Sequence, residues 1–227
     1  MFAVARHELS LDHLNPEQRA AAEHRDGPLL ILAGAGTGKT ATLAARVAVL
    51  LERGVAAERI LLLTFTRRAA REMLGRVDAL RGAGRAAERV RGGTFHALGW
   101  QIVQAHAATL GLPPEPTVLD AGDAADLLDL LREEHGLVTA SRRMPRKRTL
   151  LDIYSRTVNA GRPLAEVVAE SYPWCAEHLD ALASLFRAYG ATKRERGLLD
   201  LDDLLVAWRA LARHAVVGPH LAASFDH

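Results

Sequence analysis

The residues with the clearest chemical potential form one glycine-rich stretch, Ala33-Gly34-Ala35-Gly36-Thr37-Gly38-Lys39-Thr40. It follows an apolar run at residues 29–33 and precedes a segment of helical periodicity at 39–52. Small residues let the backbone curl so that successive N–H groups point at phosphate oxygens, and a helix start adds positive potential. Lys39 is predicted to reach the β- and γ-phosphates, and the Thr40 hydroxyl is predicted to bind Mg²⁺. The stretch therefore predicts a site for a nucleoside triphosphate with Mg²⁺.

We accordingly assign Lys39 and Thr40 as catalytic residues, Thr40 as a metal ligand, and residues 33–40 as cofactor-binding. The strict pattern begins with glycine where this chain has Ala33, a familiar variant. The alternative is a tight strand-to-helix turn without a ligand. Gly-Lys-Thr placed between an apolar run and a helix favours the ligand site.

Several elements must position this stretch. The wholly apolar run 29–33 and the run 60–65 predict buried parallel strands, and residues 90–95 supply a candidate third strand. Asn15 and Pro16 predict a helix start, since Asn caps well and Pro suits the first helical position. Further helices are predicted over 39–52 and 68–80. Strands alternating with helices indicate an α/β domain with a parallel sheet.

After His96 the pattern changes to almost entirely helical, from about 98 to 212, with breaks at residues 111–114, 136, 141–145, 161–163 and 197. This predicts an all-helical subdomain inserted into the α/β domain. The predicted divisions are residues 1–104, the first part of the P-loop domain; 105–197, the helical insertion; and 198–227, the return to the P-loop domain.

The composition is that of an ordinary globular protein. The 227 residues are 49% hydrophobic and 25% charged, and the net charge of +2 does not by itself argue for a nucleic-acid partner. The single cysteine, Cys175, cannot form an internal disulfide, and packing is a more typical role for it than reactivity. No segment looks like a signal peptide or an apolar span of about 20 residues. We expect a cytoplasmic protein that does not enter membranes.

Three further segments carry a family resemblance. Leu14-Asn15-Pro16-Glu17-Gln18-Arg19-Ala20-Ala21 resembles the Q motif of UvrD/Rep/PcrA-type superfamily-one DNA helicases. The resemblance implies that Gln18 reads adenine, and an amide can donate to and accept from an adenine edge at once. Residues 63–73 look like motif Ia and residues 93–98 like motif Ib. In place of the Asn-Lys that the family often has, this chain has Arg67-Arg68.

The last two motifs touch single-stranded DNA in the family. The resemblance implies that contact for the following residues: Thr64, Phe65, Thr66, Arg67, Thr94, Phe95 and His96. The chemistry is suitable, because hydroxyls and strand-end N–H groups hold phosphates and aromatic rings stack on bases.

The resemblance covers the chain from Leu14 to Phe225 and implies a fold and an activity. The fold would be an incomplete RecA-like P-loop sheet with the helical insertion. The activity would be 3′-to-5′ unwinding and single-stranded-DNA translocation driven by ATP with Mg²⁺, on single-stranded and duplex-junction DNA. Repair, replication restart and recombination all stay open as the cellular role.

In the family, a strand ending in Asp-Glu-x-Gln-Asp follows the position of Phe225, and a second motor domain comes later in the same chain. Hydrolysis needs acids and an arginine from those parts. We therefore expect these 227 residues alone to bind nucleotide weakly without useful turnover, and to be marginally stable because a sheet edge is exposed.

Two charged segments have two interpretations each. Residues 199–205 resemble the family's return to the ATPase domain, and we interpret Asp200 as a helix cap with Asp202 and Asp203 in the first turn, in preference to a metal site. Residues 141–162 hold seven basic residues and one acid, Asp152. This stretch is either a grip for phosphates of duplex DNA or a solvated loop.

Two other classes of function compete with a motor. One is another P-loop NTPase or kinase, which would leave Gln18 and the two strand-end motifs unexplained. The other is a nucleotide-dependent DNA-binding module without motor activity. Stimulation of ATPase by single-stranded DNA separates the motor from the kinase, and DNA binding without turnover favours the module.

Overall fold

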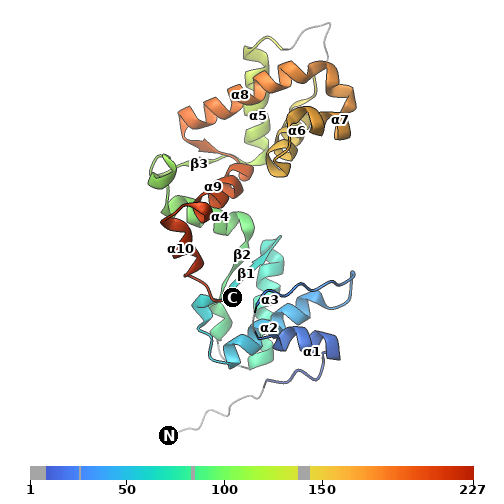
Figure 1. Cartoon of the computed structure of the whole chain (residues 1–227), viewed down its shortest axis with the longest axis vertical. Helices are drawn as coiled ribbons and strands as arrows, with labels where there is room; N and C mark the ends of the chain where they lie inside the picture. The colour runs from blue at the N-terminus through green and yellow to red at the C-terminus, as the bar shows by residue number, and fades with distance from the viewer. Residues whose placement is uncertain (1–8, 26, 83–84, 138–143) are drawn as a thin grey trace. The chain divides into compact units, whose positions relative to one another are not determined.

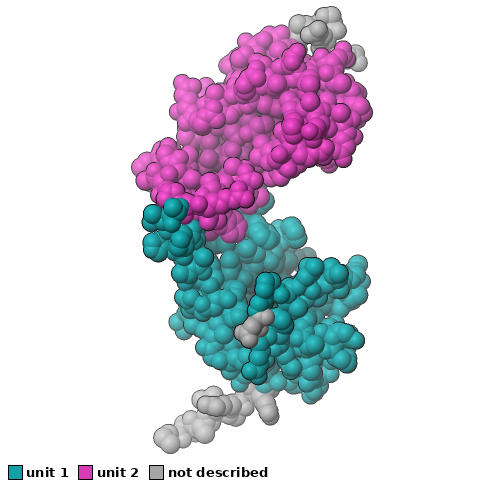
Figure 2. Space-filling model, in the orientation of Figure 1, with its two compact units in different colours: residues 1–98, 215–227 teal, residues 99–214 magenta. Residues whose placement is uncertain are grey.

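The structure is a computed structural model that describes residues 9–25, 27–82, 85–137 and 144–227. The chain forms two compact units (Figures 1 and 2). We call residues 1–98 with 215–227 the P-loop unit, and residues 99–214 the helical unit. The chain leaves the P-loop unit once and returns to it once, so the helical unit is continuous in sequence and the P-loop unit is not.

The P-loop unit consists of helices around a small parallel sheet. Its elements are α1 (Pro16–Glu23), α2 (Lys39–Glu52), the 3-10 helix η1 (Ala57–Arg59), β1 (Leu61–Thr64), α3 (Arg67–Arg81), the 3-10 helix η2 (Arg85–Arg89), β2 (Arg91–Thr94), the start of α4 (Phe95–Ala105), and α10 (Val217–Ala222). β1 and β2 are parallel, with Leu61 opposite Arg91 and Thr64 opposite Thr94. The predicted helices and the third strand at residues 90–95 are confirmed.

One apolar core joins α2, α3 and β1. It includes Val47 and Leu51 of α2, Met73 and Val77 of α3, and Leu62 of β1, all buried. A second, smaller core joins α1 to α2 through Ala22, Ala45 and Val49, together with Leu11 and Leu14. The two cores lie on different faces of α2, which explains why this helix, which begins at Lys39, is mostly buried.

The prediction of a buried strand over residues 29–33 is wrong. The segment has no strand assignment, and Leu30 and Leu32 are 81% and 86% exposed. A strand needs a neighbour for its N–H and C=O groups, and the described sheet around β1 holds only β1 and β2. β2 pairs with one edge of β1. At the start of the other edge, the Leu61 N–H donates to the His227 carbonyl at 2.8 Å.

The helical unit is built from helices around one large apolar core and a smaller one formed by Val103, Leu199 and Leu204. Its elements after α4 are the 3-10 helix η3 (Ala108–Leu110), β3 (Thr117–Val118), α5 (Ala121–Glu134), α6 (Lys147–Ala160), α7 (Leu164–Ser171), the 3-10 helix η4 (Pro173–His178), α8 (Leu179–Arg196), β4 (Leu198–Leu199) and α9 (Leu201–Arg213). Side chains from α5, α6, α7 and α8 fill the large core, and Cys175 is buried in it. Packing is the role that the structure gives Cys175.

The helical unit is not all-helical as predicted. β3 and β4 pair in parallel, with Thr117 opposite Leu198 and Val118 opposite Leu199. The sequence pattern does not reveal this pair because the two strands are short and far apart along the chain. The pair places the start of α5 next to the start of α9, and each of these helices begins at an aspartate cap, Asp120 and Asp200. The predicted cap at Asp200 is confirmed.

Within the described ranges, no helix is both long and apolar enough to cross a membrane.

The predicted breaks at Gly111, Gly136, Gly161 and Gly197 fall at helix ends, where each glycine has a positive φ. Part of the predicted basic stretch, residues 141–143, lies outside the described residues.

Candidate functional site

The glycine-rich stretch forms an exposed loop that ends at the first residue of α2. Gly36 and Gly38 have φ values of 76° and 82°, a left-handed conformation that favours glycine. Gly38 is the N-cap of α2 and provides no side-chain cap for the first turn. The N–H groups at the start of α2 are therefore available to an anion, as expected for a phosphate-binding helix start.

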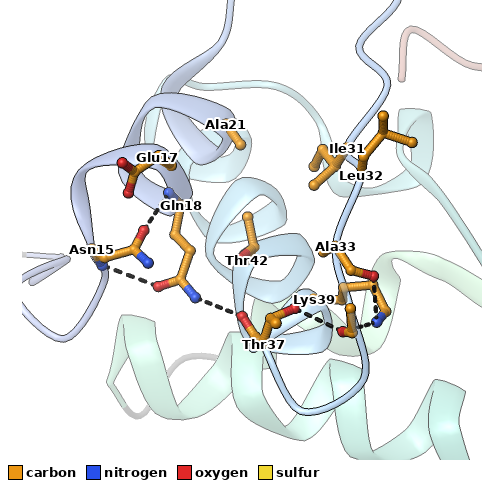
Figure 3. Close-up of a pocket in the computed structure, with 11 residues that line it drawn as sticks. Asn15, Glu17, Gln18, Ala21, Ile31, Leu32, Ala33, Thr37, Lys39 and Thr42 are labelled. Atoms are coloured by element: carbon orange, nitrogen blue, oxygen red, sulfur yellow. Dashed lines mark hydrogen bonds between the residues drawn. The ribbon is translucent and has the colours of Figure 1, made fainter.

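Lys39 folds back over this loop. Its ammonium donates to the carbonyl oxygens of Ala33 and Gly34, at 3.0 and 2.5 Å, and the Thr37 hydroxyl donates to the Gly34 carbonyl at 2.8 Å (Figure 3). Lys39 is exposed, and these carbonyls are neutral partners. A phosphate oxygen would be a stronger partner for the ammonium than a carbonyl, since both groups would be charged.

Gln18 joins α1 to the loop. Its Oε1 accepts from the Asn15 N–H at 3.0 Å, and its Nε2 donates to the Thr37 carbonyl at 2.9 Å (Figure 3). Asn15 in turn caps α1 by accepting from the Gln18 N–H at 2.8 Å. A Cβ at Gly38 would lie 2.7 Å from Gln18 Nε2, so this approach requires glycine. The residue predicted to read a base therefore contacts the loop predicted to hold phosphates.

A cavity of about 350 Å³ lies between α1 and the loop. It is lined by Asn15, Glu17, Gln18, Ala21, Ile31, Leu32, Ala33, Gly34, Thr37, Lys39 and Thr42. Of the predicted cofactor-binding residues, Gln18, Ala33, Gly34, Thr37 and Lys39 line it, whereas Ala35, Gly36, Gly38 and Thr40 do not. The sequence analysis missed Ile31 and Leu32, which offer apolar surface in the cavity, because we interpreted them as buried strand residues.

The seven predicted DNA-contacting residues cluster at the carboxyl ends of β1 and β2. These ends are adjacent because Thr64 pairs with Thr94. The rings of Phe65 and Phe95 lie 5.9 Å apart, centroid to centroid, at 45°. Thr66, Arg67 and His96 are exposed beside them, so the structure brings the predicted set together on one surface. Only the interpretation of 60–65 as fully buried is wrong, since Phe65 is 93% exposed.

Three threonines of this set already have hydrogen bonds. Thr64 is buried and its hydroxyl donates to the Thr66 carbonyl at 2.9 Å. The hydroxyl of Thr66 caps α3 by accepting from the Ala69 N–H, and the hydroxyl of Thr94 accepts from the Ala97 N–H. These hydroxyls shape the strand ends, which leaves the aromatic rings and the exposed basic and imidazole groups as the freest groups for binding a ligand.

The acidic pair at the start of α9 binds a lysine. Lys193 of α8 is buried, and its ammonium lies 2.5 Å from Asp200 Oδ2 and 2.5 Å from Asp203 Oδ2. The Tyr189 hydroxyl donates to Asp200 at 3.0 Å, and the Lys193 ammonium lies over the Tyr189 and Tyr154 rings. Burial alone would lower the pKa of Lys193, but the two carboxylates outweigh burial and raise it. Lys193, Asp200 and Asp203 therefore form a structural ion cluster, as opposed to a metal site.

Several residues of the basic stretch have acidic partners. Lys147 pairs with Asp126, and Arg162 bonds to Glu166 and Glu170 at 3.2 and 2.6 Å. Among the described residues, no acid pairs with Arg146 or Arg148, and both are exposed. Arg156 is also exposed, and its printed partners, the Ser171 hydroxyl and the Tyr172 ring, are neutral. Among the described residues of the stretch, carboxylates therefore pair with Lys147 and Arg162, and Arg146, Arg148 and Arg156 keep exposed positive charge.

The fold and the loop together define a class, that of α/β proteins with a P-loop motif and a helical insertion. The sequence model of the UvrD/REP helicase N-terminal domain matches residues 14–227, and the chain belongs to this family. It is 37% identical over 199 residues to the ATP-dependent DNA helicase UvrD1 of Mycobacterium tuberculosis, an alignment that covers 86% of this chain. It is 33% identical over 198 residues to the ATP-dependent DNA helicase PcrA of Staphylococcus aureus, again over 86% of this chain.

The chain spans about a quarter of the length of these relatives, 25% of UvrD1 and 26% of PcrA. The family match begins at Leu14, the first residue of the predicted Q motif, and so includes every predicted site residue.

Proposed function

We propose that this chain is the ATP-binding N-terminal part of an ATP-dependent DNA helicase that moves 3′ to 5′ along single-stranded DNA. The observation that carries the proposal is the Gln18–Thr37 hydrogen bond, which joins the amide predicted to read a base to the glycine-rich loop, with both residues lining one cavity. The predicted divisions at 1–104, 105–197 and 198–227, with an incomplete RecA-like sheet in the P-loop part, belong to this proposal.

The bonding capacity of Gln18 suits adenine. An amide has two N–H donors and two lone pairs on oxygen. One donor goes to Thr37 and one lone pair to the Asn15 N–H. One donor and one lone pair remain, and adenine presents one acceptor, N7, and one donor, the N6 amino group, on the same edge. Gln18 can therefore read adenine without releasing either α1 or the loop.

The loop residues suit the phosphates. The helix start at Lys39, the left-handed glycines Gly36 and Gly38, and the exposed ammonium of Lys39 form a cradle for negative charge. Thr40 follows Lys39 in the first turn of α2 and would contribute its hydroxyl to Mg²⁺. Bound ATP with Mg²⁺ would supply the free energy of phosphoanhydride hydrolysis.

We infer that the chain alone binds ATP and does not turn it over. Hydrolysis requires an acid that helps to hold Mg²⁺ and a second cation for the transition state. Of the described residues that line the cavity, Glu17 is the only acid and Lys39 the only cation. Single-stranded DNA would bind at the ends of β1 and β2, and duplex-junction DNA would contact the basic stretch of the helical unit.

The test measures the binding of a fluorescent ATP analogue to the purified chain, with Lys39→Ala as the variant. We expect Lys39→Ala to bind about tenfold more weakly or worse, because it removes a charge-assisted hydrogen bond to the phosphates. Lys147→Ala, which removes a lysine in the other unit, is the matched control. Equal binding by wild type and Lys39→Ala would reject the nucleotide site.

The second arm tests the motor in the full-length protein. A helicase motor predicts that single-stranded DNA stimulates ATP turnover and that Lys39→Ala abolishes it. DNA binding without any turnover would instead favour a nucleotide-dependent DNA-binding module.

A further inference from the structure

Arg46 of α2 and Arg53, the C-cap residue of α2, hold the carboxyl end of α1. The Arg46 Nη1 donates to the carbonyl oxygens of His24 and Ala21, at 2.8 and 3.2 Å, and the Arg53 Nη2 donates to the Glu23 carbonyl at 3.0 Å. The last carbonyls of a helix have no partner inside that helix, and α1 has no basic residue of its own in its last turn. The cations that complete α1 therefore come from the helix that begins at the P-loop.

The packing of α1 on α2 brings these two arginines within reach of the α1 carbonyls. Ala22 and Ala45 are fully buried where α1 meets α2, and such small residues let the two helices approach closely. Arg46 and Arg53 are seven residues apart, two helical turns, and so project from the same side of α2. Burial, followed by the positive charge of Arg53, lowers the pKa of Arg46, as expected for a guanidinium that rests on carbonyls and not on carboxylates.

The helix α1 depends on such interactions because it is short. It has eight residues, and a helix of this length has little stability by itself. At its amino end, the polar link to the loop is the Gln18 side chain. At its carboxyl end the polar links are the two arginines. Gln18 and Ala21 are three residues apart, about 4.5 Å along the helix axis, so a shift of the carboxyl end would displace the amide.

We propose that Arg46 is a positioning residue for nucleobase recognition, with Arg53 in support. Arg46 holds α1 against α2 so that the free donor and lone pair of Gln18 face the cavity in the orientation that an adenine edge requires. This inference rests on the proposed function, because it concerns the same nucleotide site. It assigns base selectivity to a side chain that is absent from the cavity lining.

The test compares three ligands in binding to the purified chain. ATP, GTP and inorganic tripolyphosphate compete with a fluorescent nucleotide for wild type, Arg46→Met and Arg46→Lys. Guanine presents acceptors at both N7 and O6, so the free groups of Gln18 match adenine better. Tripolyphosphate reports on the loop alone. Arg76→Met is the matched control, since Arg76 is an exposed arginine of α3 that pairs with Glu72 at 2.7 Å.

We expect Arg46→Met to bind ATP about tenfold more weakly, the effect of removing roughly one hydrogen bond to a charged group. Its preference for ATP over GTP should fall, and its affinity for tripolyphosphate should stay within about twofold of wild type, because the loop itself is unchanged. Arg46→Lys, which keeps a positively charged hydrogen-bond donor group, should recover part of the preference. Thermal melting of each variant shows that the compared proteins are folded, and Arg53→Met replaces Arg46→Met if the latter does not fold.

Two results would overturn the inference. One is an unchanged preference for ATP over GTP in Arg46→Met. The other is an equal loss of affinity for all three ligands, which would show that Arg46 only stabilises the unit. A wild-type chain that binds ATP no better than tripolyphosphate would reject base reading by Gln18 before any arginine variant is compared. The nucleotide site of the proposed function is rejected by a different result, equal binding by wild type and Lys39→Ala.

Discussion

At the residue scale, the exposed ring of Phe65 has the properties of a ligand-binding group. Phe65 is 93% exposed and Phe95 38% exposed, although leaving an aromatic ring in water forgoes the favourable free energy of its burial. The two rings lie beside each other in a tilted arrangement, at a centroid distance of 5.9 Å. Both follow directly after a strand whose hydrogen bonds fix its end. The arrangement suits the stacking of unpaired bases.

We predict that Phe65→Ala weakens the binding of single-stranded DNA by about tenfold, within the range expected for one base stacked on one ring. Fluorescence anisotropy with a labelled oligonucleotide measures the affinity for single-stranded DNA. Trp174→Ala is the control, because Trp174 is also exposed, at 66%, but lies in the helical unit. Phe65→Ala with wild-type DNA affinity would contradict a stacking role.

At the element scale, the Lys193 cluster ties three helices together. Lys193 and Tyr189 come from α8, Asp200 and Asp203 from the start of α9, and the Tyr154 hydroxyl of α6 accepts from Lys193 at 3.2 Å. The charges are buried, so their hydrogen bonds must all be satisfied for the cluster to be stable. Its two carboxylates belong to the capping box of α9, so the cluster holds the start of α9 against α8.

We predict that Lys193→Met lowers the free energy of unfolding by about 3–5 kcal/mol, because it leaves two carboxylates without their cation. Urea denaturation of the purified chain measures the change. Lys147→Met, which removes an exposed lysine paired with Asp126, should change stability little. If Lys193→Met unfolds at the same urea concentration as wild type, the cluster does not hold these helices.

The elements differ in how far the sequence predicts them. Helix starts at Asn15 and Asp200 were predictable because the caps are local. The strand predicted at 29–33 was wrong because a strand depends on neighbours, and apolar residues alone do not supply them. The hydrogen bonds of Arg46 were missed since they join helices that are separate in the chain, although its seven-residue spacing from Arg53 was visible in the sequence.

At the scale of the whole molecule, the positive charge exposed on the helical unit predicts salt-dependent binding of duplex DNA. We expect Arg146→Gln with Arg148→Gln to weaken duplex binding and to reduce the slope of log K against log salt by about 2, one unit for each arginine that no longer neutralises a phosphate. Binding at several salt concentrations measures both effects. Arg162→Gln is the control, because Glu166 and Glu170 already bond to Arg162. An unchanged slope in the double variant would favour the solvated-loop interpretation.

The sequence predicted which of the candidate site residues lie together better than it predicted the sheet. Gln18 and Lys39 line one cavity, and the residues of both strand-end motifs share one surface. These positions follow from motifs whose residues lie close together in the chain. The sheet depends on pairing between distant segments, such as His227 with β1, and no local pattern reports such pairing.

The discontinuous P-loop unit has a consequence for the order in which the protein folds during synthesis. The helical unit, residues 99–214, is continuous and can fold as soon as it has left the ribosome. The edge of β1 that bonds to His227 must wait until that residue has been synthesised. About 160 residues separate Leu61 from His227, which at typical rates of translation is a delay of roughly 10–30 s. During that time the Leu61 N–H lacks its His227 partner, and an unpaired strand edge is a template for wrong pairing or for a chaperone.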